Sequence, residues 1–147
     1  MTQKALLQSA GDGTAVPQGY VGETLTSNVS SISLGSSASY KTLTSLTLNK
    51  GVYLVFAKLA WSLTSTGLTG LSALAGGISL SNNALDGDGR QRVLIPTSNV
   101  TNTDIAVSPR YLVISSDSTL VYLVSRIDYS SAGSATAEGL ITSVRIA

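Results

Sequence analysis

The sequence predicts an all-β fold, an antiparallel β-sandwich of the jelly-roll type, and three observations carry this prediction. Apolar and polar residues alternate with a period of two along most of the chain, as in strands that bury one face. The segments between these runs are rich in Gly, Asn, Asp, Ser and Pro, which favour tight turns. No helix longer than two turns is indicated. At 147 residues the chain is one domain, large enough to bury a core without disulfides.

Eight strands are expected in order along the chain. The first two alternate hydroxyl with aliphatic side chains, and a tight turn at residues 49–51 leads into the third, which is the longest. The fourth and fifth flank a segment rich in Gly, Asn and Asp, and the sixth and seventh are joined by Ser116–Asp117–Ser118. The predicted strands cover residues 28–34, 42–48, 52–63, 73–81, 91–95, 105–115, 119–129 and 140–146. Eight strands with hairpin spacing are typical of a two-sheet jelly roll.

Two of these strands are apolar on both faces, although a sandwich strand normally has one face in water. One face of the third strand carries Val52, Leu54, Phe56 and Lys58, and its other face carries Tyr53, Val55, Ala57, Leu59, Trp61 and Leu63. One face of the seventh strand carries Leu120, Tyr122 and Val124, and its other face carries Val121, Leu123 and Ile127. A second copy of the chain, in a closed symmetric assembly, would bury the extra face. The alternative is that scattered surface Val and Tyr need no explanation.

Composition excludes several classes of function. The chain has no Cys and no His, so it lacks thiolate ligands, disulfides and the usual acid/base group at neutral pH. A net charge of +1 with 12% charged residues is far from that of a nucleic-acid binder. The uncharged stretch 59–85 is too rich in Ser, Thr, Gly and Asn to span a bilayer, and residues 1–7 do not form a secretion signal. No cofactor, nucleic acid or membrane span is expected.

The run Asp86–Gly87–Asp88–Gly89 has the spacing of a calcium loop, in which alternate oxygens converge on one cation. The remaining ligands of such a loop are missing, so a turn is the preferred interpretation. A catalytic carboxylate pair is disfavoured as well, because a Gly-flanked loop offers no apolar pocket to raise one pKa. No catalytic or metal-binding residue is therefore assigned, and the protein is expected not to be an enzyme.

Two arginines stand on apolar strands, where a guanidinium needs a carboxylate partner. Arg126 precedes Asp128, and Arg145 lies among the aliphatic residues of the last strand. Structural pairing is the preferred interpretation, and a site for an anionic ligand at a subunit interface is the alternative. Trp61 is expected to pack in the core or at an interface. The candidate interface residues are Tyr53, Trp61, Tyr122, Arg126 and Arg145.

The run Gly11–Asp12–Gly13–Thr14–Ala15–Val16–Pro17–Gln18–Gly19–Tyr20–Val21–Gly22–Glu23 resembles a segment of tailed-phage fibre and tail-tip proteins, where it leads into a distal β domain. The closing segment 138–147 and the run Gly51–Val52–Tyr53–Leu54–Val55–Phe56 resemble the trimeric jelly-roll heads of the complement-C1q and tumour-necrosis-factor type. The resemblance implies a lead-in over residues 1–23 and a homotrimeric, TNF-like head domain over 24–147. It also implies a virion protein at the tip of a tail fibre or tail needle, in contact with other tail proteins and with a host receptor such as a glycan or lipopolysaccharide. A structural capsid or head-decoration protein is the alternative. The chain is expected to be a fragment of a longer fibre or needle, because such proteins have a shaft upstream.

Strand parity predicts which loops share an end of the sandwich, because each antiparallel connection switches ends. If the first strand leads away from the virion, loops 35–41, 64–72, 96–104 and 130–139 lie at the free apex, whereas 49–50, 82–90 and 116–118 lie at the base. The apex set is almost uncharged, which suits weak, multivalent contact with a polar surface. The candidate receptor-contact residues are Ser36, Ser37, Thr66, Asn99, Asn102, Ser130, Ser131 and Thr136.

Overall fold

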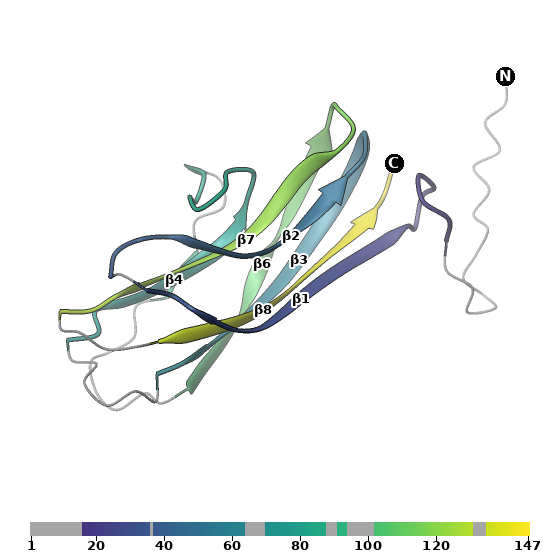
Figure 1. The fold of residues 1–147 in the computed structure, drawn as a ribbon. Helices are drawn as coiled ribbons and strands as arrows, with labels where there is room; N and C mark the ends of the chain where they lie inside the picture. Colours follow the sequence, from purple (N-terminus) through teal and green to yellow (C-terminus); the bar gives the residue numbers. More distant parts are fainter. Residues whose placement is uncertain (1–15, 36, 64–69, 88–90, 94–101, 131–134) are drawn as a thin grey trace, which may run out of the picture.

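The structure of the protein is a computed structural model (Figure 1). It describes residues 16–35, 37–63, 70–87, 91–93, 102–130 and 135–147; for residues 91–93 and 102 the description covers the backbone alone. The strands are β1 (Thr24–Ser33), β2 (Lys41–Leu48), β3 (Gly51–Ser62), β4 (Ala73–Ser79), β5 (Gln91–Val93), β6 (Asn102–Ile114), β7 (Thr119–Asp128) and β8 (Thr136–Arg145). All eight predicted strands are present. No helix in the described part of the chain is long and apolar enough to cross a membrane.

The strands form two four-stranded antiparallel sheets (Figure 1). Sheet A has the order β1-β8-β3-β6, and sheet B has the order β2-β7-β4-β5. Apart from the β4–β5 pair, successive strands alternate between the sheets, which is the connectivity of a jelly roll. The protein is thus an all-β jelly-roll sandwich, as the sequence predicts.

The core lies between the two sheets and is filled by the inward faces of β3, β7 and their neighbours. Tyr53, Val55, Leu59 and Trp61 of β3 are fully buried, whereas Phe56 on the opposite face is 39% exposed. The period-two prediction for the third strand is therefore confirmed. Trp61 also links the sheets, because its indole Nε1 donates a 2.8 Å hydrogen bond to Ser125 Oγ of β7.

Sheet B is buried on both faces near its centre. Every residue of β4 is buried, and Val124 of β7 has no exposed surface although its alternation places it on the outer face. The turn after β4 explains this burial: it folds back over β7 and reaches β2, where Asn82 Oδ1 accepts from the Thr42 hydroxyl and Asn83 Oδ1 accepts from Thr42 N–H. The chain itself thus supplies cover that the sequence analysis assigned to a second copy.

In sheet A, the edge strand β1 and its neighbour β8 begin earlier than predicted. β1 starts at Thr24 instead of residue 28, and β8 starts at Thr136 instead of residue 140. In β8 the inward positions are the small residues Ala137 and Gly139, which hide the alternation. A Cβ at Gly139 would lie 2.5 Å from Leu123 Cδ2, so the sandwich is packed too closely there for a larger residue. β4 ends at Ser79 instead of residue 81, because Ser79 Oγ accepts hydrogen bonds from the N–H groups of Ser81 and Asp86 and so closes a turn.

The sandwich has two distinct ends, here called the terminal end and the loop end. At the terminal end Thr24 pairs with Val144, and Gly22 N–H donates to Arg145 O. At the loop end Ser62 lies opposite both Asn102 and Thr136, so β1, β3, β6 and β8 begin or end together. These strand ends meet where the parity argument places the apex. The loops that join them there, 64–69, 94–101 and 131–134, lie outside the described residues.

One part of the parity argument is wrong. Parity predicts that segment 82–90 lies at the base, but Asn82 and Asn83 return to Thr42 on sheet B, away from that end. A loop that re-covers a sheet face does not mark an end of the sandwich, and parity alone has no means of detecting this.

Candidate functional site

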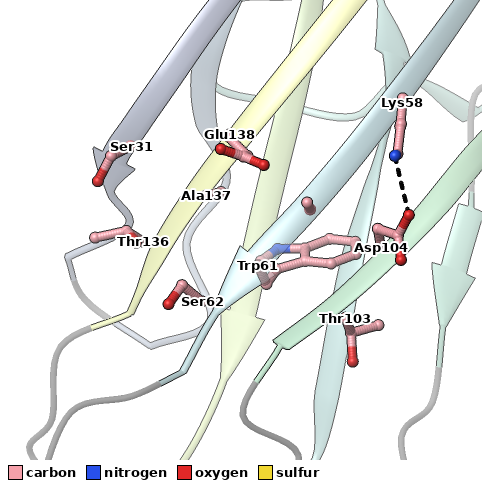
Figure 2. Close-up of a pocket in the computed structure, with 10 residues that line it drawn as sticks. Ser31, Lys58, Trp61, Ser62, Thr103, Asp104, Thr136, Ala137 and Glu138 are labelled. Atoms are coloured by element: carbon pink, nitrogen blue, oxygen red, sulfur yellow. Dashed lines mark ion pairs between the residues drawn. The ribbon is translucent and has the colours of Figure 1, made fainter.

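A groove crosses the outer face of sheet A toward the loop end. Its volume is about 480 Å³, and it is lined by Ser31, Lys58, Ala60, Trp61, Ser62, Thr103, Asp104, Thr136, Ala137 and Glu138 (Figure 2). These residues come from all four strands of the sheet. An adjoining hollow of about 280 Å³ shares Lys58, Ala60 and Glu138 with it and continues toward Asn28 and Leu140. Cavities of this size are in the range that holds small-molecule ligands.

The hollow exists because the outward side chains of β3 become small toward the loop end. After Phe56 and Lys58, the next outward positions are Ala60 and Ser62. Ala60 lies directly opposite Glu138 of β8 on one side and opposite Asp104 of β6 on the other. A carboxylate therefore stands on each side of a methyl-sized floor.

The charged groups of the groove are exposed. Lys58 Nζ lies 3.0 Å from Asp104 Oδ2, and both side chains are more than half exposed (Figure 2). Such a pair contributes little to stability, about 0–1 kcal/mol. Glu138 is exposed and forms no hydrogen bond or ion pair with any described residue. The groove therefore presents one ammonium and two carboxylates, together with the hydroxyl-bearing residues Ser31, Ser62, Thr103 and Thr136.

A β-bulge aims Ser31 at the groove. The β1–β8 register runs from Val29 opposite Gly139 to Ile32 opposite Ala137, so β1 holds one extra residue at this point. Ser31 has a φ of 57°, an uncommon conformation for a residue other than glycine. Bulges of this kind redirect a side chain out of the regular alternation.

Next to the groove, toward the terminal end, the same face is apolar. Phe56, Tyr111, Val113 and Leu140 are 39%, 61%, 67% and 41% exposed. The register places Leu54 of β3 opposite both Tyr111 and Val144. Leu54, Tyr111 and Val144 therefore occupy neighbouring positions on this face. The outer face of sheet A thus has an apolar patch and a polar groove side by side.

Two of the five candidate interface residues are in the core: for Tyr53 this corrects the prediction, and for Trp61 it confirms the core alternative. Tyr53 and Trp61 are 0% and 1% exposed, so neither side chain can reach a partner. Both lie on the inner face of β3, and the sequence pattern alone did not say which apolar face points inward. Tyr122 is half-buried on the outer face of sheet B.

The two arginines are paired within the chain, as the preferred interpretation held. Arg126 Nε and Nη2 donate to the two oxygens of Asp128 at 2.6 and 2.9 Å, and the guanidinium lies 5.5 Å from the centre of the Tyr40 ring. The hydrogen bond to Asp128 raises the pKa of Arg126 above its usual value, against the opposing effect of burial.

Arg145 holds the terminal end together. Its Nη2 donates to Lys50 O at 2.7 Å, and its Nη1 donates to the Tyr53 hydroxyl at 3.3 Å and lies 4.0 Å from Glu23 Oε2. Glu23 is buried and also accepts a hydrogen bond from Gly19 N–H. With its donors directed to these groups, Arg145 ties β8 to the lead-in and to the β2–β3 turn.

The candidate receptor-contact residues have mixed positions. Ser36, Thr66, Asn99 and Ser131 lie outside the described residues, and Asn102 is described only as the first residue of β6. Ser37 Oγ donates to Tyr129 O and accepts from Tyr129 N–H, so this hydroxyl has a structural role. Ser130 is exposed at the loop end, and Thr136 lines the groove.

The groove residues Lys58, Asp104 and Glu138 were not singled out from the sequence. They lie on three different strands, and only the strand register brings them together. Lys58 alone gave a local indication of a polar site, because it is a charged residue on an otherwise apolar strand face.

The comparisons with known proteins give fold-level likenesses alone. No family model matches the chain, and no curated protein matches it. A structure of infectious bursal disease virus, Gx strain, is 17% identical with a TM-score of 0.48, and the match covers 86% of this chain and 34% of that chain. A structure of the Gt strain is 18% identical with a TM-score of 0.42, covering 86% and 38%. The crystal structure of the infectious bursal disease virus VP2 subviral particle is 17% identical with a TM-score of 0.32, covering 84% and 37%. The chain spans little more than a third of the length of these chains.

Proposed function

We propose that the protein is a non-enzymatic structural component of the exterior of a virus particle. The observation that carries the proposal is that residues 22–23, where the described chain enters the sandwich, lie beside the end of the last strand. The lead-in and the last strand are joined by backbone hydrogen bonds between Gly22 and Arg145 and between Arg145 and Glu23. A support attached at the terminal end would leave the loop end free. The fold and the resemblance of the run 11–23 to phage fibre and tail-tip proteins support the same proposal.

The absence of catalysis is part of the proposal. The partly buried charged side chains in the described part of the chain form ion pairs, as in Arg110–Asp86 and Arg126–Asp128. The carboxylates of the groove are exposed to water, whereas a general acid needs an apolar setting that raises its pKa. Incubation of the purified protein with lipopolysaccharide or capsule should release no reducing ends above a heat-treated control. Release above that control would overturn this part of the proposal.

Two more specific roles fit this proposal. A capsid or head-decoration protein requires only the fold and contacts with other copies, so we place it first. The tip of a tail fibre or tail needle requires in addition that a host receptor binds at the loop end or beside it. Stoichiometric binding to empty capsids would support the first role. Substitution of Ser130, or of Asn99 and Asn102, would support the second role if virus particles then failed to adsorb to the host while the protein still assembled.

We further propose that the assembly is a homotrimer in which the apolar patch of sheet A is buried. Phe56, Tyr111 and Val113 are each more than one-third exposed, and such a patch is typical of an interaction surface. This part of the patch lies on β3 and β6, away from the hollow that Leu140 lines, so a second copy can cover it without disturbing either sheet or the groove.

A further inference from the structure

We propose that the polar groove on sheet A binds a short neutral oligosaccharide. The inference rests on the host-contact form of the proposed function and gives that contact a place and a ligand class. Under this inference the host ligand binds in the groove instead of at the loop tips. The groove is lined by Ser31, Lys58, Ala60, Asp104, Thr136 and Glu138.

The spacing of donors and acceptors suits a ligand with neighbouring hydroxyl groups. Lys58 Nζ and Asp104 Oδ2 are 3.0 Å apart, so a donor and an acceptor stand side by side at the rim. Two adjacent sugar hydroxyls can engage such a pair at once, one accepting from the ammonium and the other donating to the carboxylate. Hydrogen bonds to charged groups are stronger than neutral ones. Glu138, which uses none of its acceptor capacity within the described chain, can receive a further hydroxyl from the opposite side of Ala60.

The net charge of the groove argues for a neutral ligand. One ammonium and two carboxylates leave a net negative charge, so a sugar that carries a carboxylate, sulfate or phosphate would be repelled. The same charge balance opposes nucleic acid, whose binding needs an excess of Lys and Arg.

The location of the groove argues against a peptide. Extended peptides bind to β proteins mainly by adding a strand to a sheet edge, through main-chain hydrogen bonds. This groove lies across the face of sheet A, over β3 and β8, whose backbone groups are already paired on both sides. Side-chain hydroxyls and charges are the groups on offer, and a sugar presents hydroxyls around its whole edge.

The dimensions favour a chain of sugars over a single ring. The hollow of about 480 Å³ continues into the adjoining hollow of about 280 Å³ across Lys58 and Glu138. The floor is alanine instead of an exposed aromatic ring, since Trp61 is 1% exposed. Each site is therefore expected to bind weakly and to gain strength from several copies displayed together.

The test is a nuclear magnetic resonance titration of the full ¹⁵N-labelled chain. The probes are neutral trisaccharides of glucose, galactose and mannose, and a sulfated trisaccharide as the charged comparison. Saturable shifts are expected at the amides of Ala60, Glu138 and Thr136 with at least one neutral probe, and none with the sulfated probe. Three neutral probes without saturable shifts, or a preference for the sulfated probe, would overturn the inference.

Variants assign the shifts to the groove. Ala60→Tyr fills the floor and should abolish the shifts, and Glu138→Gln keeps the shape and should weaken binding at least tenfold. Thr47→Tyr, which adds the same ring at an exposed position on β2 of the other sheet, should bind like the unchanged protein. Melting curves establish that each variant is folded; if Ala60→Tyr is not, Glu138→Gln alone decides. Undiminished binding by folded Glu138→Gln would contradict the assignment.

Failure of this inference differs from failure of the proposed function. A protein that is present on purified particles but binds no neutral sugar in the groove refutes the groove alone. A protein that is absent from particles refutes the virion role, whatever the sugar titration shows.

Discussion

Arg110 of β6 and Asp86 of the turn after β4 form an ion pair that joins the two sheets. Arg110 Nη1 lies 2.7 Å from Asp86 Oδ1 and also donates to Ile78 O of β4 at 2.9 Å. Asp86 Oδ2 in turn accepts from Leu80 N–H. Both side chains are less than one-quarter exposed. The guanidinium thus crosses from the edge of sheet A to sheet B, where the described part of β5 pairs with Leu74–Gly76 and does not extend to Ile78.

This pair predicts that Asp86→Asn destabilises the protein. The sequence alone indicates a turn at residue 86, and at an exposed turn position the same change would be close to neutral. Leaving a partly buried guanidinium without its carboxylate should cost about 1–3 kcal/mol in the free energy of unfolding, measured by urea denaturation. Asp104→Asn is the matched control, because its pair with Lys58 is exposed and should change stability by less than about 1 kcal/mol. Equal stabilities for the two variants would contradict the structural role of Asp86.

The bond between Trp61 and Ser125 predicts a second stability effect. Ser125→Ala leaves the buried indole N–H without an acceptor, which should cost about 1–3 kcal/mol. Ser143→Ala is the control, since Ser143 is equally buried and its hydroxyl has no partner among the described residues. Ser143→Ala should be neutral or stabilising by thermal denaturation. A larger loss for Ser143→Ala than for Ser125→Ala would show that the hydrogen bond is not what matters.

Gly76 of β4 predicts a position where an added methyl group is not tolerated. A Cβ there would lie 2.8 Å from Val124 O and would also overlap Leu59 Cδ1. Overpacking of this kind costs about 1–3 kcal/mol. Gly87→Ala, whose new Cβ would meet no atom within 4 Å, should leave the urea midpoint nearly unchanged. If Gly76→Ala unfolds at the same midpoint as Gly87→Ala, the close packing of β4 on β7 is wrong.

The proposed homotrimer predicts that charge in the apolar patch breaks the assembly. Light scattering at micromolar concentration should report about three times the chain mass, as for a closed cyclic assembly. Phe56→Asp or Tyr111→Asp should reduce it to the monomer mass with the fold retained. Leu120→Asp, on the outer face of the other sheet at a similar exposure, should remain trimeric. A monomeric unchanged protein would refute the trimer. Tyr53→Asp is unsuitable for this test, because it would unfold the core.

The fold could be predicted from the sequence because β3 keeps apolar residues at alternate positions and because the strands are separated by turn-forming segments. The inner face of β3 contains the aromatic and aliphatic residues that the period of two assigned together. The site could not be predicted in the same way. Lys58, Asp104 and Glu138 meet only through the order β8-β3-β6, which depends on long-range pairing. The bulge at Ser31 and the return of the turn 80–87 over sheet B are likewise tertiary effects with no local pattern.

The location of the protein on purified virus particles tests the central claim most directly. Particles of the virus that encodes the chain would be purified, labelled with antibody against the folded domain and imaged by electron microscopy. The account predicts label on the outside of intact particles at regular positions. Protein found in the infected-cell lysate but absent from purified particles would contradict the account.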